Sequence, residues 1–373
     1  MKILYYSSLP LSDADFPLVR AMRRSGADVR YVIPLLPDHP TGPLGTLTPK
    51  KCSALVPARE YEPLRAYEDY LSLDDVYVLN RTVRGARPRN ILLYLKFVWK
   101  ILRFRPDIIQ ITWPLSGPEL PLYLLRRKMV LTVHDPFPHS SDENPRNTRQ
   151  RALAFRLCPR FVLLNSRQAP SFREYYNIRK PVLTTSLSAY DILSHGFPAD
   201  RSDDGYIIFF GRITPYKGLD VLLKAVPLVR EVLPGQQFIV AGKGTVEGPL
   251  PEGVTLVNEY IDSGRRADLL SHCSAVVCPY RDATQSGVVF TAFAFGKPVI
   301  ASDVGALSEA VEDGVTGLLV PPLDPAALAD AIVRLRREEG LAEKLSSRVS
   351  ELYANGGSWD EIAAAYLAFY ASE

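Results

Sequence analysis

The chain has 373 residues, more than one hydrophobic core usually supports, so we expect two domains of roughly 150 to 200 residues each. Hydrophobic residues make up 47% and charged residues 23%, which is typical of a globular protein and excludes long disordered stretches. The net charge of +3 hides a division: residues 1–199 carry 29 Lys and Arg against 17 Asp and Glu, and residues 200–373 carry 15 against 24. The basic first half predicts contact with an anionic surface or substrate.

The apolar and cysteine patterns predict a cytoplasmic protein. No window approaches the roughly eighteen uninterrupted apolar residues of a membrane span. The apolar start is soon broken by serines and aspartates, which suits a first buried strand better than a signal peptide. Neither a paired C-x-x-C spacing nor a histidine arrangement typical of zinc surrounds the four cysteines, so we expect unpaired, buried thiols in a reducing compartment at Cys52, Cys158, Cys273 and Cys278.

Strands and helices alternate through the first half. Residues 1–8 form an apolar strand, and the spacing of Phe16, Val19 and Met22 predicts a helix that ends at Gly26 before a second strand. A strand, a helix and a strand within about thirty residues indicate a βαβ unit and a parallel sheet. Further segments continue this doubly wound α/β pattern: strands at 107–113, 129–135 and 160–165, a helix near 118–128 and another from about Ser166.

The pattern is interrupted once and then resumes. Residues 183–204 are polar and rich in turn formers, so we place the interdomain linker there. Short strands near 206–210, 237–241, 254–258, 275–279 and 298–301 follow, separated by helical patterns. The segment from Ser358 begins with a good helix cap and an acidic first turn.

Two blocks in the second half predict a site for a nucleoside diphosphate. In the first, an apolar strand ends at Gly211, Arg212 and Lys217 lie in the turn, and a helix pattern is opened by Gly218 and Asp220. Such a turn can direct two cations at one diphosphate. In the second block, residues 285–305, Ser286 and Gly287 precede a helix whose unpaired N–H groups attract an anion.

These blocks resemble retaining glycosyltransferases of the GT-B type, specifically family 4 (glycosyl transferases group 1). The resemblance is carried by Gly211, Arg212, Lys217, Gly218 and Asp220, and then by Gly296, Lys297, Pro298, Val299, Gly305 and Glu309; it is looser before residue 200. It implies two Rossmann-like, doubly wound domains facing a central cleft. Residues 1–190 would bind the acceptor and 191–357 the nucleotide-sugar donor, and a terminal helix, 358–373, would pack back on the first domain.

The sequence departs from the family at one place. The family usually has two glutamates where this chain has Ala283 and Thr291, and a subgroup is similar to this chain in reading A-T-Q-S-G-V there. The resemblance to that subgroup implies that Gln285 and Ser286 face the donor. Thr291 could bond a ribose hydroxyl, more weakly than a carboxylate would.

The resemblance also implies roles for individual residues. Arg212 and Lys217 would stabilise the departing diphosphate, and His134, in a strand-end loop, would lie near the reacting sugar. The donor would be bound by Gly211, Gly242, Gly244, Glu259, Tyr260, Ile261, Gln285, Ser286, Gly287, Val288 and Thr291. The acceptor would be bound by Ser8, Asp15, Phe16 and Asp135.

Several of these residues have an alternative interpretation. Asp135 precedes a proline and is also an ordinary turn former, and His139 lies in the same loop. Glu309 suits the first turn of a helix. His39, His195 and His272 show no partner pattern, and we interpret them as structural. No D-x-D sequence lies at a strand end, so we expect metal-independent transfer without a cofactor.

The segment Arg81 to Arg105 contains eight Lys and Arg and no acidic residue. Its aromatic and apolar centre, residues 91–102, is typical of an amphipathic helix at a membrane surface, which predicts peripheral attachment at the inner face of the plasma membrane. The alternative is a core helix with solvated cations. The basic residues are not interleaved with aromatic ones in a recognisable nucleic-acid module, so we expect no nucleic-acid partner.

The sequence therefore predicts a retaining hexosyltransferase. It would transfer a sugar from a nucleoside diphosphate, UDP rather than GDP, to a lipid-linked or polysaccharide acceptor in cell-surface glycan synthesis. Two alternatives remain open at this stage. One is a catalytically degenerate protein that binds nucleotide-sugar or membrane, and the other is a sugar-nucleotide epimerase of the same architecture, which would need acidic residues in the cleft.

Overall fold

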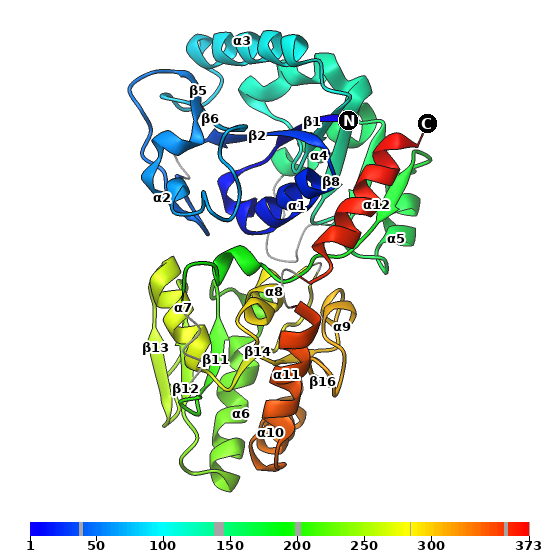
Figure 1. The fold of residues 1–373 in the computed structure, drawn as a ribbon. Helices are drawn as coiled ribbons and strands as arrows, with labels where there is room; N and C mark the ends of the chain where they lie inside the picture. Colours follow the sequence, from blue (N-terminus) through cyan, green and yellow to red (C-terminus); the bar gives the residue numbers. More distant parts are fainter. Residues whose placement is uncertain (37–39, 138–144, 198–202, 284, 354–356, 373) are drawn as a thin grey trace. The chain divides into compact units, whose positions relative to one another are not determined.

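The computed structural model describes residues 1–36, 40–137, 145–197, 203–283, 285–353 and 357–372. Two compact units are present (Figure 1). The first comprises Met1–Pro136, Glu143–Leu187 and Ser358–Glu373, and the second comprises Ser188–Gly357 with Phe137–Asp142.

The first unit is built on an eight-stranded sheet in the order β10-β9-β8-β7-β1-β2-β6-β5. All neighbouring strands are parallel except β5 and β6. Apolar side chains dominate these strands because both faces of a parallel sheet are covered by helices. The strands are β1 (Lys2–Tyr6), β2 (Asp28–Leu35), β5 (Ala54–Pro57), β6 (Val76–Asn80), β7 (Ile108–Ile111), β8 (Met129–Val133), β9 (Arg160–Leu163) and β10 (Val182–Thr184), with a separate hairpin of β3 (Thr41–Gly42) and β4 (Gly45–Thr46).

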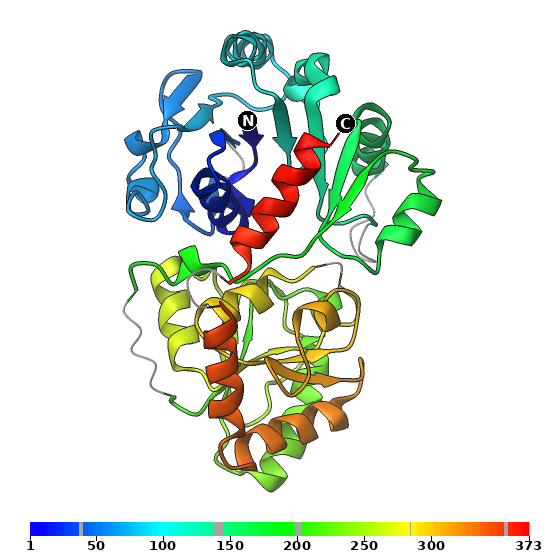
Figure 2. The same cartoon turned by 45° about the vertical axis from the view of Figure 1, so that its right-hand side comes forward.

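Helices cover the sheet of the first unit. They are α1 (Ser12–Arg24), α2 (Glu62–Arg65), α3 (Pro88–Phe104), α4 (Pro145–Leu157), α5 (Ala169–Tyr175) and α12 (Trp359–Ala371). The last of these packs against α1, as Figure 2 shows with α12 in red and α1 in blue. Its Tyr370 hydroxyl donates to Gln110 Oε1 of β7 at 2.7 Å, and Arg160 of β9 donates to the carbonyls of Phe369 and Tyr370. Buried polar contacts thus fix α12 to the sheet.

The second unit has a six-stranded, wholly parallel sheet in the order β13-β12-β11-β14-β15-β16. The strands are β11 (Ile207–Phe210), β12 (Phe238–Ala241), β13 (Val254–Val257), β14 (Ala275–Cys278), β15 (Val299–Ser302) and β16 (Gly317–Val320). The helices are α6 (Leu219–Val232), α7 (Ser263–His272), α8 (Gly287–Ala294), α9 (Leu307–Ala310), α10 (Pro325–Arg337) and α11 (Leu341–Tyr353). The strand order reverses next to β11, and in such sheets ligands bind beyond the carboxyl ends of the strands at this reversal.

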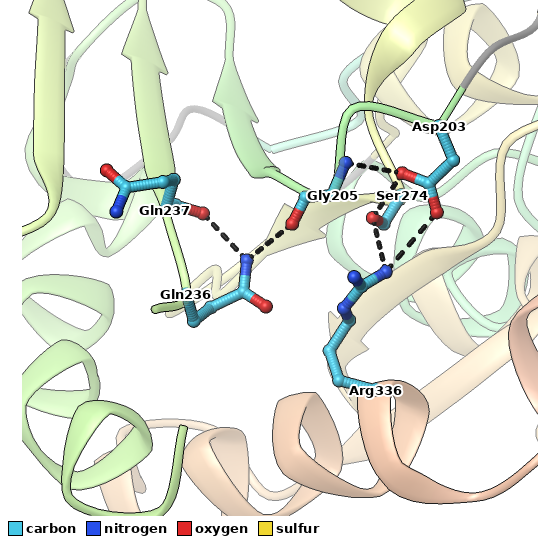
Figure 3. A network of polar contacts seen from close by, with 6 residues as sticks. All are labelled: Asp203, Gly205, Gln236, Gln237, Ser274 and Arg336. Carbon is cyan, nitrogen blue, oxygen red and sulfur yellow. Dashed lines mark hydrogen bonds and ion pairs between the residues drawn. The ribbon is translucent and has the colours of Figure 1, made fainter. Parts of the chain in front are cut away.

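A polar network secures the segment that leads into β11 (Figure 3). Arg336 of α10 bonds Asp203 at 3.2 Å and the Ser274 hydroxyl at 2.7 Å. Burial would raise the pKa of Asp203, but the bonds from Ser274 and the Gly205 N–H, with the charge of Arg336, hold it below its ordinary value. Gln236 completes the network by donating to the carbonyl of Gly205. The entry to the second sheet is therefore held to α10 and to the start of β14.

The structure corrects several predicted elements. Residues 117–128 form a 3-10 segment, η3 (Gly117–Lys128), in which Pro121 removes an N–H donor that an α-helix needs. The predicted linker contains β10, and the helix after β9 begins at Ala169. Cys52 is exposed, whereas the other three thiols are buried and unpaired as predicted. Neither the β5–β6 edge nor β16 was predicted.

Candidate functional site

The carboxyl ends of β11 and β12 meet at a close backbone contact in the second unit. Gly211 follows β11 and Gly242 follows β12, and the Gly211 N–H donates to the Ala241 carbonyl at 2.9 Å. Gly242 has a φ of 149°, and a Cβ added there would lie 1.9 Å from the Gly211 carbonyl oxygen. Only glycine allows these two turns to approach so closely. Both predicted glycines therefore shape one strand-end surface.

Lys217 places its ammonium group at the same strand end. It ends a 3-10 turn, Pro215–Lys217, before Gly218 caps α6 with a φ of 66°. A Cβ built on Gly211 would lie 2.9 Å from Lys217 Nζ, and this nitrogen also lies 5.2 Å from the centre of the Tyr280 ring. The residue is only 8% exposed, and no carboxylate pairs with it in the described part of the chain. A buried cation without a counter-ion suits an anionic ligand.

The N-terminus of α8 faces the same point. Ser286 is its N-cap, and Val288 in its first turn has a methyl group 3.2 Å from the Cβ position of Gly211. The N–H groups of a helix's first turn have no partner within the helix, so they can donate to an anion. The Ser286 hydroxyl is held by a bond to the Tyr280 hydroxyl at 3.3 Å. Lys217 and this helix start thus both lie beside Gly211.

Arg212 and the backbone beyond β12 and β13 complete this surface. Arg212 is exposed, and its charge acts on Lys217. Asn258 holds the Gly244 turn by bonding both its N–H and its carbonyl, at 3.0 and 2.9 Å. Glu259 and Tyr260 are exposed, whereas Ile261 is buried. Tyr280 and Asn258 were not predicted, because nothing in the local sequence shows which turn they support.

Thr291 bonds within its own helix. It is buried, and its hydroxyl donates to the Gly287 carbonyl at 2.7 Å within α8. This bond between residues four apart is a common one for threonine in a helix. The structure therefore gives no support to a ribose contact by Thr291. Ala283 is also buried, and its carbonyl lies against Gly305, while Gln285 is half-buried next to the α8 start.

We expect diphosphate binding to weaken at alkaline pH. Burial, reinforced by the charge of Arg212, lowers the pKa of Lys217 to about 8. The charged form binds the anion, so affinity for UDP should fall by about tenfold per pH unit above pH 8; the terminal phosphate of UDP takes up a proton only at about pH 6 and is fully ionised in this range. Calorimetric titration with UDP from pH 6 to about 10 measures this. Lys217→Arg, which stays charged throughout, should remove the decline, and an equal decline in that variant would contradict the assignment.

In the first unit, three predicted residues line one pocket at the carboxyl ends of β1, β7 and β8. This pocket has a volume of about 310 Å³ and contains Ser8, His134 and Asp135 together with Thr112, Trp113 and Arg151. Burial lowers the pKa of His134, although Asp135 opposes the shift, so the imidazole is neutral at pH 7. His134 Nε2 is buried and has no hydrogen-bond partner among the described residues. A neutral ring with a free nitrogen can bond a hydroxyl group.

Asp15 and Phe16 lie elsewhere. Phe16 is 0% exposed and packs edge-to-face on Tyr31. Asp15 accepts bonds from the hydroxyls of Tyr5 and Tyr31 at 2.8 and 3.1 Å, and burial raises its pKa to about 7. Both lie on the side of α1 that is buried in the core, so the structure does not support the prediction that they contact the acceptor. His139 lies outside the described residues.

Comparison with known proteins agrees with this architecture. Residues 204–338 match the family described as Glycosyl transferases group 1. HepE from Anabaena, crystallised with UDP and glucose, superposes with a TM-score of 0.69 at 17% identity over 99% of this chain and 100% of that one. Sucrose-phosphate synthase from Thermosynechococcus elongatus gives 0.65 at 18% identity over 99% and 98%. These likenesses confirm the predicted fold, two Rossmann-like α/β domains as in GT-B glycosyltransferases.

Curated relatives match a part of the chain. Phosphatidyl-myo-inositol mannosyltransferase of Mycobacterium leprae is 35% identical over 173 residues, which are 44% of this chain and 46% of the relative. D-inositol 3-phosphate glycosyltransferase of Mycobacterium avium is 34% identical over 181 residues, 45% of this chain and 42% of the relative. Each match thus spans less than half of the relative's length.

Proposed function

We propose that this protein is a retaining glycosyltransferase that takes a sugar from a nucleoside diphosphate, UDP in preference to GDP. The observation that carries the proposal is the buried, uncompensated Lys217 beside Gly211 and the start of α8. The match of residues 204–338 to a glycosyltransferase family supports it. The family name alone suggests no role for a particular side chain, and the position of Lys217 supports the role proposed for it.

The chemistry follows from where charge develops. As the bond between sugar and diphosphate breaks, negative charge accumulates on the leaving diphosphate. Lys217, Arg212 and the N–H groups at the start of α8 would stabilise it there. The departing phosphate oxygen can accept the proton of the acceptor hydroxyl, so the reaction needs no strong protein nucleophile. His134, neutral and with a free ring nitrogen, would position a sugar or acceptor hydroxyl.

A direct test uses nucleotide binding and then turnover. UDP, GDP, ADP and TDP are each added to the wild type and to Arg212→Ala/Lys217→Ala while the melting temperature is followed. A ligand at a hundredfold excess over its dissociation constant adds about 2.7 kcal/mol, which shifts the transition by several degrees. We expect UDP to stabilise the wild type and not the double variant.

Turnover separates the proposal from its rivals. With the matching UDP-sugar and acceptor, the product should keep the anomeric configuration of the donor, as read by NMR, and EDTA should not stop the reaction. An epimerase would release a changed sugar nucleotide without transfer. A protein that binds UDP and never turns over a sugar donor would be the degenerate alternative.

We also propose that α3 attaches the protein to an anionic membrane surface. The outward side of this helix is apolar: Trp99 is 60% exposed, and Leu92, Leu95 and Leu102 are about half exposed. The neighbouring η3 adds Leu124, which is 71% exposed. No acidic residue lies on α3, and exposed Lys96, Lys100, Arg89 and Arg103 flank the apolar stripe. Apolar side chains with cations beside them fit the boundary between acyl chains and anionic headgroups.

This placement refines the predicted basic segment. Arg81 is 7% exposed and follows β6, so it belongs to the interior of the unit and not to the membrane face. The helix itself begins at Pro88. Within the described ranges, no helix is both long enough and apolar enough to cross a bilayer.

We expect Trp99→Ser/Leu102→Ser to reduce sedimentation with vesicles of phosphatidylcholine and phosphatidylglycerol. Lys96→Ala/Lys100→Ala should weaken binding by roughly fivefold per lysine at low salt, since each contributes about 1 kcal/mol near an anionic surface. The matched control, Leu228→Ser/Leu352→Ser, removes two exposed leucines from the second unit and should bind as the wild type does. Unchanged binding by the α3 variants would refute the membrane role.

A further inference from the structure

We propose that the first unit binds an acceptor carrying a phosphate group, and that Arg81 and Arg151 hold this phosphate in a pocket next to His134. The proposal rests on the proposed transferase function and adds the chemical class of the acceptor. The pocket measures about 460 Å³ and lies where β6 and β7 end. It shares Trp113, Pro114 and Arg151 with the pocket that contains His134. The two pockets are therefore adjacent.

Both arginines line this pocket, and each has a buried N–H group without a partner among the described residues. Arg81 is 7% exposed, and its Nε has no hydrogen-bond partner among the residues that the structure describes. Arg151 Nη1 also lacks a partner there, whereas another part of the Arg151 guanidinium bonds the Tyr176 side chain. Another part of the Arg81 guanidinium contacts the Tyr94 hydroxyl, which orients it. A buried N–H without an acceptor costs free energy, and a ligand oxygen would relieve that cost.

The one carboxylate among the described residues that line the pocket can offset the charge of at most one of the two arginines. Glu119 accepts bonds from the Tyr6 hydroxyl at 2.8 Å, the Ser116 N–H at 3.1 Å and Trp113 Nε1 at 3.4 Å. Burial raises its pKa above the ordinary value, although these bonds and the charge of Arg81 oppose the shift. Its oxygens are thus already occupied by other donors. The pocket keeps an excess of positive charge.

The chemistry of the donors favours phosphate. Two guanidinium groups offer planar sets of N–H groups that match the oxygens of a phosphate, and their charge cannot be lost by titration. Gly85 and Ala86, which precede α3, also line the pocket. A phosphate could come from a water-soluble phosphorylated alcohol or from a lipid headgroup. Binding of a soluble phosphorylated alcohol and binding to vesicles distinguish these two sources.

In the first arm, the full chain is titrated with glycerol 3-phosphate and, as a matched probe, with glycerol. We expect the phosphate to bind and glycerol not to. Arg151→Gln and Arg81→Gln should each weaken binding by at least about tenfold, because each removes a charge-assisted hydrogen bond. Arg151 is only half-buried, so its variant keeps the test valid if Arg81→Gln does not fold. Arg127→Gln, which removes an exposed guanidinium in η3, should bind as the wild type does.

In the second arm, the same variants are tested on vesicles with and without phosphatidylglycerol. Weaker vesicle binding by Arg151→Gln assigns the phosphate to a lipid, and unchanged vesicle binding with lost glycerol 3-phosphate binding assigns it to a soluble acceptor. Wild-type behaviour of both arginine variants in both arms overturns the proposal. UDP binding is measured on every variant and should be unaffected, so failure of the donor site is seen separately.

Discussion

Lys217→Met is expected to lower kcat/KM for the sugar donor by roughly a hundredfold or more while leaving the fold as stable as before, or more so. The loss of activity follows because a charge placed at the developing diphosphate charge contributes about 3 kcal/mol. The gain in stability follows from burial, which lowers the Lys217 pKa to about 8. At pH 7 the folded state therefore carries an unfavourable buried charge that methionine removes. Steady-state kinetics and thermal unfolding measure the two effects.

The matched control is Lys224→Met. Lys224 is exposed on α6 and pairs with Asp220 at 3.7 Å, so its loss should change UDP affinity by less than about twofold. A Lys217→Met protein that keeps wild-type UDP affinity would remove the central support of the proposed function. A large fall in melting temperature would instead assign Lys217 a structural role.

Gly242→Ala should destabilise the second unit by about 3 kcal/mol and abolish UDP binding. The added methyl group would lie 1.9 Å from the Gly211 carbonyl oxygen. Neither backbone can move aside easily, because Gly211 and Gly242 directly follow the paired strands β11 and β12. Separating the strand ends would also move Gly211 away from Lys217. Denaturant unfolding and UDP titration report the two losses.

Gly248→Ala is the control for backbone strain. Its φ is 77°, also unfavourable for alanine, but no atom lies within 4 Å of the added methyl group. We expect a cost of only about 1 kcal/mol and normal UDP binding. Equal costs at the two positions would show that conformational strain, and not the close contact, decides the effect.

The second unit was more predictable than the first because its site is assembled locally. Gly211, Lys217 and Gly218 lie in one turn, and Ser286 lies directly before its helix, so their spacing shows where they meet. The strands of this unit are short apolar runs, which are recognisable without tertiary information. Asn258 and Tyr280 were not predicted because they contact residues that are distant in sequence. Their residue types fit many other positions equally well.

The first unit shows where sequence patterns mislead. Arg81 stands in a run of cations, yet it alone is drawn into the interior, next to Tyr94 and Glu119. Phe16 and Asp15 follow the first strand, as acceptor residues would, yet the helix turns both toward the core. The direction in which a helix residue points depends on which face the sheet covers. The adjacent residues in the sequence do not show which face of the helix will be covered.

The return of α12 to the first sheet sets the order in which the protein can be completed during synthesis. Residues 358–371 supply part of the packing on α1 and bonds to β7 and β9, but they leave the ribosome only after the whole second unit. The second unit can fold as soon as its own residues emerge, because both of its segments, Phe137–Asp142 and Ser188–Gly357, precede α12 in the chain. Until α12 has been synthesised, Gln110 and Arg160 of the first sheet lack the partners that α12 supplies. The unit that is synthesised first therefore completes its folding last, and its incompletely packed sheet would be the main binding site for a chaperone.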